Sequence, residues 1–140
     1  MNIVNFEKYL LKNKINNDME NHKNILDLLN INWRKYIKLN TKKYCKNCIF
    51  RNDKYELYII SWMPKQYTNL HSHPNNGCIM KILNGSLNEI RIKNNEIIEN
   101  NYFPNQTTFM SNSYGKHIIS NIGSEITISL HLYSPPNFYN

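Results

Sequence analysis

From residue 55 onward, apolar side chains alternate with polar ones over short stretches, a pattern typical of β-strands with one buried face. Turn-forming Asn and Gly residues separate these stretches, as at Asn84-Gly85 and Asn94-Asn95. The predicted strands are Tyr55–Trp62, Gly77–Leu83, Leu87–Lys93, Thr107–Ser111, Gly115–Asn121 and Glu125–Tyr133. Many short strands in succession favour a mainly β fold, a closed barrel or jelly roll.

The pattern before residue 55 is different. Apolar residues recur at spacings of three and four over residues 5–13 and 18–30, which predicts two short amphipathic helices. Asp18 is suited to cap the second helix, and a further helical turn is expected over Trp33–Ile37. Two to three helices followed by strands indicate a helical cap on a barrel.

A chain of 140 residues fits a single domain, here with residues 1–54 as the cap and 55–140 as the barrel. The cap holds twelve Lys or Arg against five Asp or Glu, whereas the barrel holds five of each. The lysines are scattered among asparagines and form no tight run. A solvated basic face is therefore favoured over a nucleic-acid partner.

The three cysteines, Cys45, Cys48 and Cys78, cannot all pair within one chain. Glu7 and Lys8 interrupt the N-terminus before a signal peptide could develop, and no apolar run is long enough to span a bilayer. We therefore expect a cytoplasmic protein without a membrane partner. The C-x-x-C of Cys45 and Cys48 lacks a second pair or a nearby histidine, so a structural role before a strand is favoured over metal or redox chemistry.

Histidines supply the candidate chemistry. His71 and His73 form an H-x-H pair, and His117 follows in a later predicted strand. An H-x-H pair in extended chain points both rings to one face, because side chains alternate with period two. Two imidazoles aimed one way, with a third from another strand, predict an open metal site.

The last predicted strand has two distinct faces. Its apolar face comprises Ile126, Ile128, Leu130 and Leu132, and its polar face comprises Thr127, Ser129, His131 and Tyr133. In an isolated terminal strand the polar face would be solvated. In a chain that already carries an H-x-H pair, a polar barrel interior that orients a ligand is the alternative.

The spacing of these residues resembles the two-motif signature of cupins, in which Cys78 occupies the position of a glutamate ligand. The thiol dioxygenase branch of the cupins also lacks that glutamate, and within this branch the chain resembles the cysteine dioxygenase family. The matching stretches are His71–Cys78, Lys81–Glu89, Gly115–Asn121 and Ser129–Pro136, with Trp33, Tyr36, Tyr44 and Asn47 before them. The resemblance covers nearly the whole chain.

This resemblance implies an iron(II)-dependent thiol dioxygenase that oxidises L-cysteine with O2 to cysteine sulfinate. His71, His73 and His117 would hold Fe(2+). Three neutral imidazoles bring no negative charge and leave positions open for a thiolate and O2. Imidazole suits several metals, so the choice of iron rests on the resemblance.

The resemblance also implies roles for five further residues. Cys78 and Tyr133 would face each other and form a thioether crosslink. His131 and Ser129 would hydrogen-bond and orient the tyrosine hydroxyl. Tyr44 would help to bind the substrate carboxylate.

The chain departs from the family at Lys46, where the carboxylate-binding residue is usually arginine. Lysine keeps the positive charge but loses the planar fork that grips a carboxylate through two hydrogen bonds. Arg51 is an alternative partner if its loop allows it. Ser72 replaces the usual aspartate between the first two ligands, and a cis bond at Ser134-Pro135 is a further family expectation.

Two other functions stay open. One is a dioxygenase for another small thiol such as 3-mercaptopropionate, and the other is a non-catalytic metal- or ligand-binding cupin. Seven residues follow Tyr133, whereas animal-type members continue through a hairpin, so a shorter wall around the site is expected. We expect a monomer.

Overall fold

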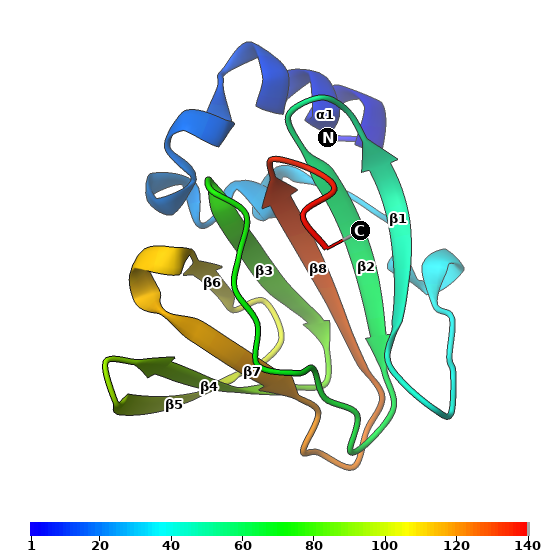
Figure 1. Ribbon diagram of the computed structural model, residues 1–140. Helices are drawn as coiled ribbons and strands as arrows, with labels where there is room; N and C mark the ends of the chain where they lie inside the picture. Colours follow the sequence, from blue (N-terminus) through cyan, green and yellow to red (C-terminus); the bar gives the residue numbers. More distant parts are fainter. Residues whose placement is uncertain (140) are drawn as a thin grey trace.

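The computed structural model describes residues 1–139, which form two antiparallel sheets and an N-terminal helical segment (Figure 1). The larger sheet has the strand order β1-β2-β8-β3-β6 and the smaller one β5-β4-β7. The strands are β1 (Cys45–Arg51), β2 (Glu56–Trp62), β3 (Gly77–Asn84), β4 (Leu87–Lys93), β5 (Glu96–Tyr102), β6 (Thr107–Met110), β7 (Lys116–Ser120) and β8 (Thr127–Ser134). The predicted mainly β barrel with N-terminal helices is confirmed.

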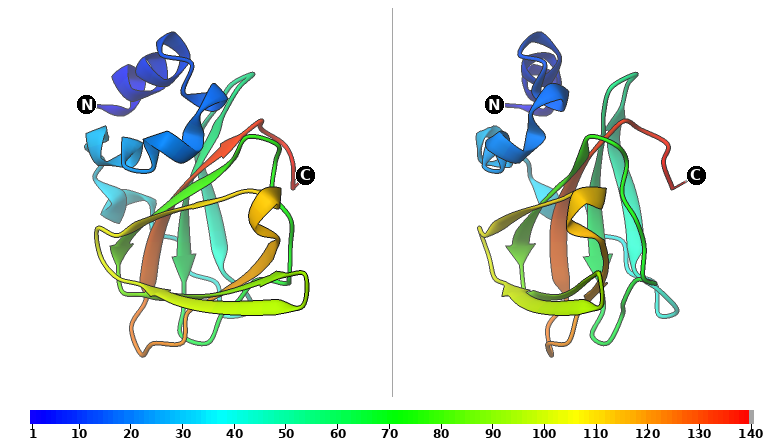
Figure 2. Two further views of the ribbon diagram at one scale, coloured as in Figure 1. Left: turned by 90° about the vertical axis from the view of Figure 1, so that its left-hand side faces the viewer. Right: turned by 60° about the vertical axis from the view of Figure 1, so that its left-hand side comes forward.

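The helical elements are short. They are α1 (Ile3–Lys12) and the 3-10 helices η1 (Ile15–Asn17), η2 (Met19–His22), η3 (Ile25–Leu28), η4 (Trp33–Tyr36) and η5 (Asn112–Tyr114). The N-terminal segment lies toward one end of the molecule and the three-stranded sheet toward the other (Figures 1 and 2). Within residues 1–139, no helix has the length and apolar character needed to cross a membrane.

The central strands β2 and β8 of the larger sheet are buried on both faces. Leu57 and Ile59 of β2 pack with Leu130 and Leu132 of β8 in a core that also includes side chains of the N-terminal segment. The alternate residues of the same strands face the barrel interior, where a second core forms around Trp62. Period-two alternation thus gives each central strand one face for the helical cap and one for the interior.

The helix predicted over residues 18–30 is wrong, because this stretch forms η2 and η3. Asp18 makes no capping hydrogen bond to the backbone, and its carboxylate instead accepts one from the side chain of Asn21 at 2.8 Å. Asparagine and aspartate side chains offer local hydrogen bonds that compete with helix formation. The first predicted helix is present as α1, where the Asn2 side chain caps the Asn5 amide.

Two strands were not predicted. β1 lies within the region expected to be helical up to residue 54, so the expected boundary falls too late, and the C-x-x-C lies inside this strand rather than before it. β5 is exposed over most of its length and therefore lacks the alternation of a half-buried strand. It pairs with β4 through a two-residue turn, in which Asn94 and Asn95 both have positive φ, as a type I′ hairpin requires.

The polar face of β8 lies in the interior. Ser129, His131 and Tyr133 are all buried, whereas Ile126 precedes the strand and is exposed. The expected cis bond at Ser134-Pro135 is present.

Candidate metal centre

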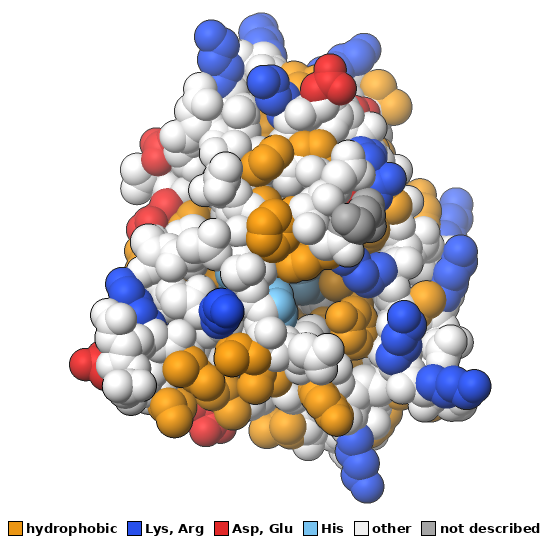
Figure 3. All heavy atoms as spheres, viewed as in Figure 1, with side chains coloured by type: hydrophobic (Ala, Val, Ile, Leu, Met, Phe, Trp, Pro, Cys, Tyr) orange, Lys and Arg blue, Asp and Glu red, His pale blue; other side chains and the backbone are white. Residues whose placement is uncertain are grey.

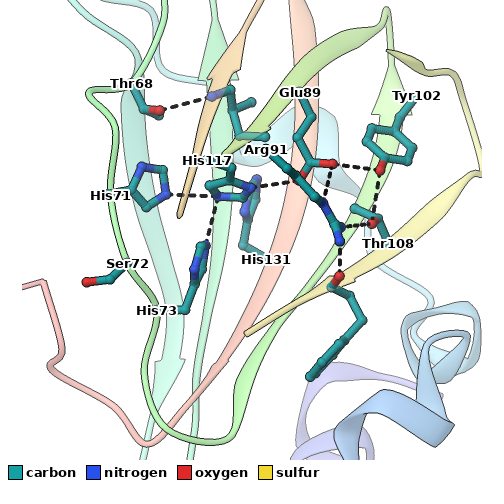
Figure 4. Close-up of polar contacts among 12 residues, drawn as sticks. Thr68, His71, Ser72, His73, Glu89, Arg91, Tyr102, Thr108, His117 and His131 are labelled. Atoms are coloured by element: carbon teal, nitrogen blue, oxygen red, sulfur yellow. Dashed lines mark hydrogen bonds and ion pairs between the residues drawn. The ribbon is translucent and has the colours of Figure 1, made fainter. Parts of the chain in front are cut away.

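Three histidines from two segments meet inside the barrel (Figure 4). His117 lies on β7, and its backbone exchanges two hydrogen bonds with His71 in an isolated bridge. His71 and His73 lie between β2 and β3, so the expectation that both occupy a strand is wrong; the extended backbone at the bridge still aims both rings inward. The Nε2 atom of His117 is 3.0 Å from that of His71 and 2.8 Å from that of His73.

Neighbouring groups fix the protons on two of these rings. The Nδ1 atom of His71 is 2.8 Å from the Asn69 carbonyl oxygen, and that of His117 is 2.7 Å from a Glu89 carboxylate oxygen. Both oxygens accept hydrogen bonds, so each Nδ1 carries a hydrogen. In the neutral rings the Nε2 atoms are then bare, and they face each other.

Facing lone pairs at this distance repel unless a cation lies between them. A proton on one nitrogen satisfies one neighbour, whereas a metal ion satisfies all three nitrogens together. Nitrogens bound about 2.0–2.1 Å from one ion and at right angles to each other lie about 2.9 Å apart. The two observed spacings, from His117 to His71 and from His117 to His73, fit ligands of one shared ion.

Burial favours the neutral, metal-binding form of two of these rings. It lowers the pKa of His71 to about 4 and the pKa of His73 to about 2. The Nδ1 atom of His73 is buried and has no hydrogen-bond partner among residues 1–139.

A buried carboxylate supports the third histidine. Glu89 on β4 is fully buried, and besides His117 it accepts hydrogen bonds from Arg91 Nε and the Tyr102 hydroxyl, both at 2.8 Å (Figure 4). Burial by itself would raise the pKa of Glu89, but the hydrogen bond from His117 and the charge and hydrogen bond of Arg91 outweigh it and lower the pKa to about 2. Arg91 is held in turn by Thr108 and a backbone carbonyl.

Sequence reasoning gave no role to Glu89 or Arg91. They follow Leu87 at intervals of two on β4, so the alternation could have placed all three on the inner face. A carboxylate that anchors a ligand histidine fixes its tautomer and raises its basicity.

The histidines open into a cavity of about 310 Å³ (Figure 3). Its lining residues are Tyr44, Lys46, Ile60, Trp62, Thr68, Asn69, His71, His73, Cys78, Met80, Thr108, Met110, His117, Ile119, His131, Tyr133 and Tyr139. This lining holds a lysine but, among the described residues, no Asp or Glu. The cavity therefore suits a small ligand that carries negative charge.

Lys46 lies on β1, one of the two strands that were not predicted, and Tyr44 directly precedes that strand. The Tyr44 ring stacks on Trp62 with ring centroids 4.7 Å apart. Burial raises the pKa of the Tyr44 phenol and lowers the pKa of the Lys46 ammonium. Arg51, the alternative carboxylate partner, does not line the cavity and instead pairs with Glu56 at 2.9 Å.

Cys78 and Tyr133 lie directly opposite each other on β3 and β8. Paired residues point to the same face of a sheet with their Cβ atoms about 4.5–5.5 Å apart. Burial raises the pKa of both side chains, which favours a neutral thiol and a neutral phenol in the absence of a ligand.

A chain of hydrogen bonds runs from Trp62 to this tyrosine. The indole Nε1 donates to Ser129 Oγ at 2.9 Å, which leaves the serine hydrogen for His131 Nε2 at 2.7 Å. The proton of His131 then lies on Nδ1, which faces the Tyr133 hydroxyl at 3.4 Å. Burial lowers the pKa of His131, consistent with a neutral ring. Apart from Arg51 and Ser129, the predicted site residues all line one cavity, and Ser129 reaches it through its hydrogen bond to His131.

The two-sheet barrel with inward-facing histidines is that of a cupin. A protein from Thermus thermophilus superposes with a TM-score of 0.65 at 16% identity, covering 76% of this chain and 96% of that one. A cupin superfamily protein from Desulfitobacterium hafniense gives a TM-score of 0.59 at 12% identity, covering 74% and 88%. At such identities these likenesses concern the fold alone.

The family model for cysteine dioxygenase type I matches residues 8–139, and the chain belongs to this family. It is 33% identical over 114 residues to cysteine dioxygenase type 1 of Homo sapiens and 28% identical over 119 residues to that of Danio rerio. Each match covers 74% of this chain, and the chain spans 57% of the length of these curated relatives. The resemblance drawn from the sequence motifs is confirmed.

Replacement of the anchoring carboxylate should weaken metal binding. In Glu89→Gln, the Nδ1 atom of His117 loses its charged acceptor, and the affinity for Fe²⁺ is expected to fall about 10- to 100-fold. Competition with a chelator under anaerobic conditions measures this affinity. Glu96→Gln, on the exposed strand β5, is the matched control and should bind as wild type does. Equal affinity in both variants would contradict the role of Glu89.

The buried histidines should make the metal-free protein sensitive to mild acid. The lowered pKa values of His71, His73 and His131 mean that the unfolded chain gains protons below pH 6.5 that the folded chain does not. The free energy of unfolding should therefore fall as the pH drops from about 6.5 to 5, by at most about 1.4 kcal/mol per pH unit for each histidine. Glu89 acts only at lower pH, where the unfolded carboxylate becomes protonated.

Urea unfolding of chelator-treated protein at several pH values tests this dependence. His131→Gln should show a shallower slope than wild type between pH 6.5 and 5, because it removes one of the groups that the folded chain keeps neutral. Identical slopes would show that His131 takes up its proton in the folded state.

Proposed function

We propose that this protein is an iron(II)-dependent thiol dioxygenase that oxidises L-cysteine to cysteine sulfinate. The observation that carries the proposal is the convergence of three imidazole rings beside Cys78, Tyr133 and Lys46, in a cavity without Asp or Glu in its described lining. Membership of the cysteine dioxygenase type I family supports it. His71, His73 and His117 would hold the ferrous ion.

The proposed reaction balances without a further reductant. The thiol R–SH and one O2 give R–SO2H, so both oxygen atoms become bonded to sulfur. A bound ferrous ion would supply the one-electron chemistry that lets ground-state dioxygen react with a thiolate. The protein supplies binding, orientation and charge.

The charges of the cavity favour a thiol that carries a carboxylate. Lys46 provides the positive charge for that carboxylate, and the Tyr44 hydroxyl, kept protonated by its raised pKa, can donate a hydrogen bond to it. The described residues of the lining include no acidic group that could pair with an ammonium. The substrate amine is therefore expected to bind in its neutral form. The same charges also suit 3-mercaptopropionate, which the assay must compare.

Tyr133 would act as a hydrogen-bond donor near the reacting sulfur. Its raised pKa keeps the phenol protonated, and its hydroxyl faces the Nδ1 atom of His131. A phenol fixed in this way can donate to an oxygen or sulfur atom on which negative charge accumulates. Ile60, Met80 and Ile119 add apolar surface to the lining of the same cavity.

A thioether between Cys78 and Tyr133 is also proposed. Their direct pairing across β3 and β8 supports it. The bond joins Sγ to a ring carbon. The thiol and the ring carbon each lose one hydrogen, and O2 is the oxidant that takes up these two protons and two electrons.

Oxygen uptake tests the proposed activity. Ferrous-loaded wild type should consume one O2 per sulfinate formed from L-cysteine. Tyr133→Phe should keep the metal and turn over at least about 10-fold more slowly, because it loses the phenolic donor. His117→Ala should lose both metal and activity. Metal binding without thiol-dependent oxygen uptake, with L-cysteine or 3-mercaptopropionate, would instead indicate a non-catalytic cupin.

Intact mass tests the crosslink. After turnover in air with iron and L-cysteine, part of the wild-type protein should be lighter by two hydrogens. Cys78→Ser and Tyr133→Phe should show no such species. The same loss of mass in Cys78→Ser would place the modification elsewhere in the chain.

A further inference from the structure

A β-bulge brings a second cation to the inner face of the larger sheet. Cys48 of β1 pairs with Tyr58 of β2, and Arg51 pairs with Glu56. The two pairs are three residues apart on β1 but only two residues apart on β2. The additional residue lies between Cys48 and Phe50, where the register shifts. Paired residues share a face, so the bulge turns the arginine toward the side on which Glu56 and Tyr58 lie.

These three side chains form a closed polar cluster. Arg51 donates to the Tyr58 hydroxyl at 2.6 Å and to Glu56 Oε2 at 2.9 Å, and the same hydroxyl donates to Glu56 Oε2 at 3.1 Å. Glu56 is 1% exposed and Tyr58 is 6% exposed. A buried hydroxyl that both accepts and donates in this way has a fixed position, and its ring is fixed with it.

The Tyr58 ring lies under the Lys46 ammonium. The Nζ atom is 4.4 Å from the centroid of Tyr58, 5.1 Å from that of Tyr139 and 5.4 Å from that of Tyr133. No carboxylate forms an ion pair with Lys46 within the described part of the chain. Aromatic faces therefore hold this cation while leaving its charge available to a ligand.

We propose that Tyr58 is a positioning residue for substrate recognition, which holds the Lys46 ammonium where it meets the carboxylate of the thiol substrate. This inference rests on the proposed function. Tyr58 does not line the cavity, so it acts through Lys46 and not through contact with the ligand. Arg51 and Glu56 fix the ring, and the ring fixes the lysine.

This arrangement offsets the conformational freedom of lysine. A lysine side chain has four flexible carbons and binds a carboxylate as a point charge, without the planar fork of arginine. A fixed aromatic face restricts the ammonium before the ligand arrives, so less freedom is lost on binding. Loss of the ring should therefore weaken the binding of carboxylate-bearing thiols selectively.

The test compares two thiols that differ in the carboxylate. Binding of L-cysteine and of cysteamine, which has the thiol and the amine but no carboxylate, is measured anaerobically by calorimetry on ferrous-loaded protein. Tyr58→Leu should weaken L-cysteine binding about 3- to 30-fold, the range expected for a cation–π contact, and leave cysteamine binding and metal content unchanged. Tyr58→Phe, which keeps the ring and loses the hydroxyl contacts, should have a smaller effect.

The Lys46→Met background provides the control. There Tyr58→Leu should have no further effect on L-cysteine binding, because the two residues act as one unit. Equal weakening of both thiols, unchanged L-cysteine binding in Tyr58→Leu, or an additional loss in Lys46→Met would overturn the proposal. So would wild type that binds L-cysteine no more tightly than cysteamine. Failure of the proposed dioxygenase activity would give a different result. The protein would then show no oxygen uptake but would still bind L-cysteine more tightly than cysteamine.

Discussion

The site depends on two unprotonated imidazole nitrogens that face each other across 3.0 Å. The carbonyl of Asn69 and the carboxylate of Glu89 hold the proton of each ring on the outer nitrogen, so neutral rings have only lone pairs to present to one another. This arrangement is unfavourable in a folded protein by itself. It becomes favourable when a cation binds. The tautomers of His71 and His117, which the fold fixes, therefore give the protein affinity for a metal.

The two-sided burial of β2 and β8 keeps these groups in place. β2 and β8 pack against the N-terminal segment through one set of alternate residues and enclose the cavity through the other. A displacement of either strand by one residue would exchange the two sets and turn the polar residues toward the helical cap. The core formed with the N-terminal segment therefore fixes the register on which the direct pairing of Cys78 with Tyr133 depends.

The sequence allowed prediction of those features that follow from the alternation of apolar and polar residues within a single stretch. The H-x-H pair and the polar face of β8 each follow from period two within one stretch. The role of Glu89 depends on β4 lying beside β7, and that of Tyr58 depends on a bulge in β1; neither can be seen in one segment. β5 was missed because it is exposed on both faces, and residues 18–30 were assigned to a helix because their apolar spacing concealed the competing asparagines.

The charges of the interior form two separate groups. The charge of Glu89 is neutralised by Arg91, and of the two nitrogens of His117 this carboxylate contacts the outer one. The charge of Glu56 is neutralised by Arg51. Both carboxylates are thus kept away from the face of the histidines that would bind a metal. A divalent ion there, together with Lys46, would give the cavity an excess of positive charge that no acidic residue of its described lining offsets. A ligand bearing both a thiolate and a carboxylate supplies the two missing negative charges, one to the metal and one to the lysine, which is why the proposed substrate and the proposed metal should bind more tightly together than either does alone.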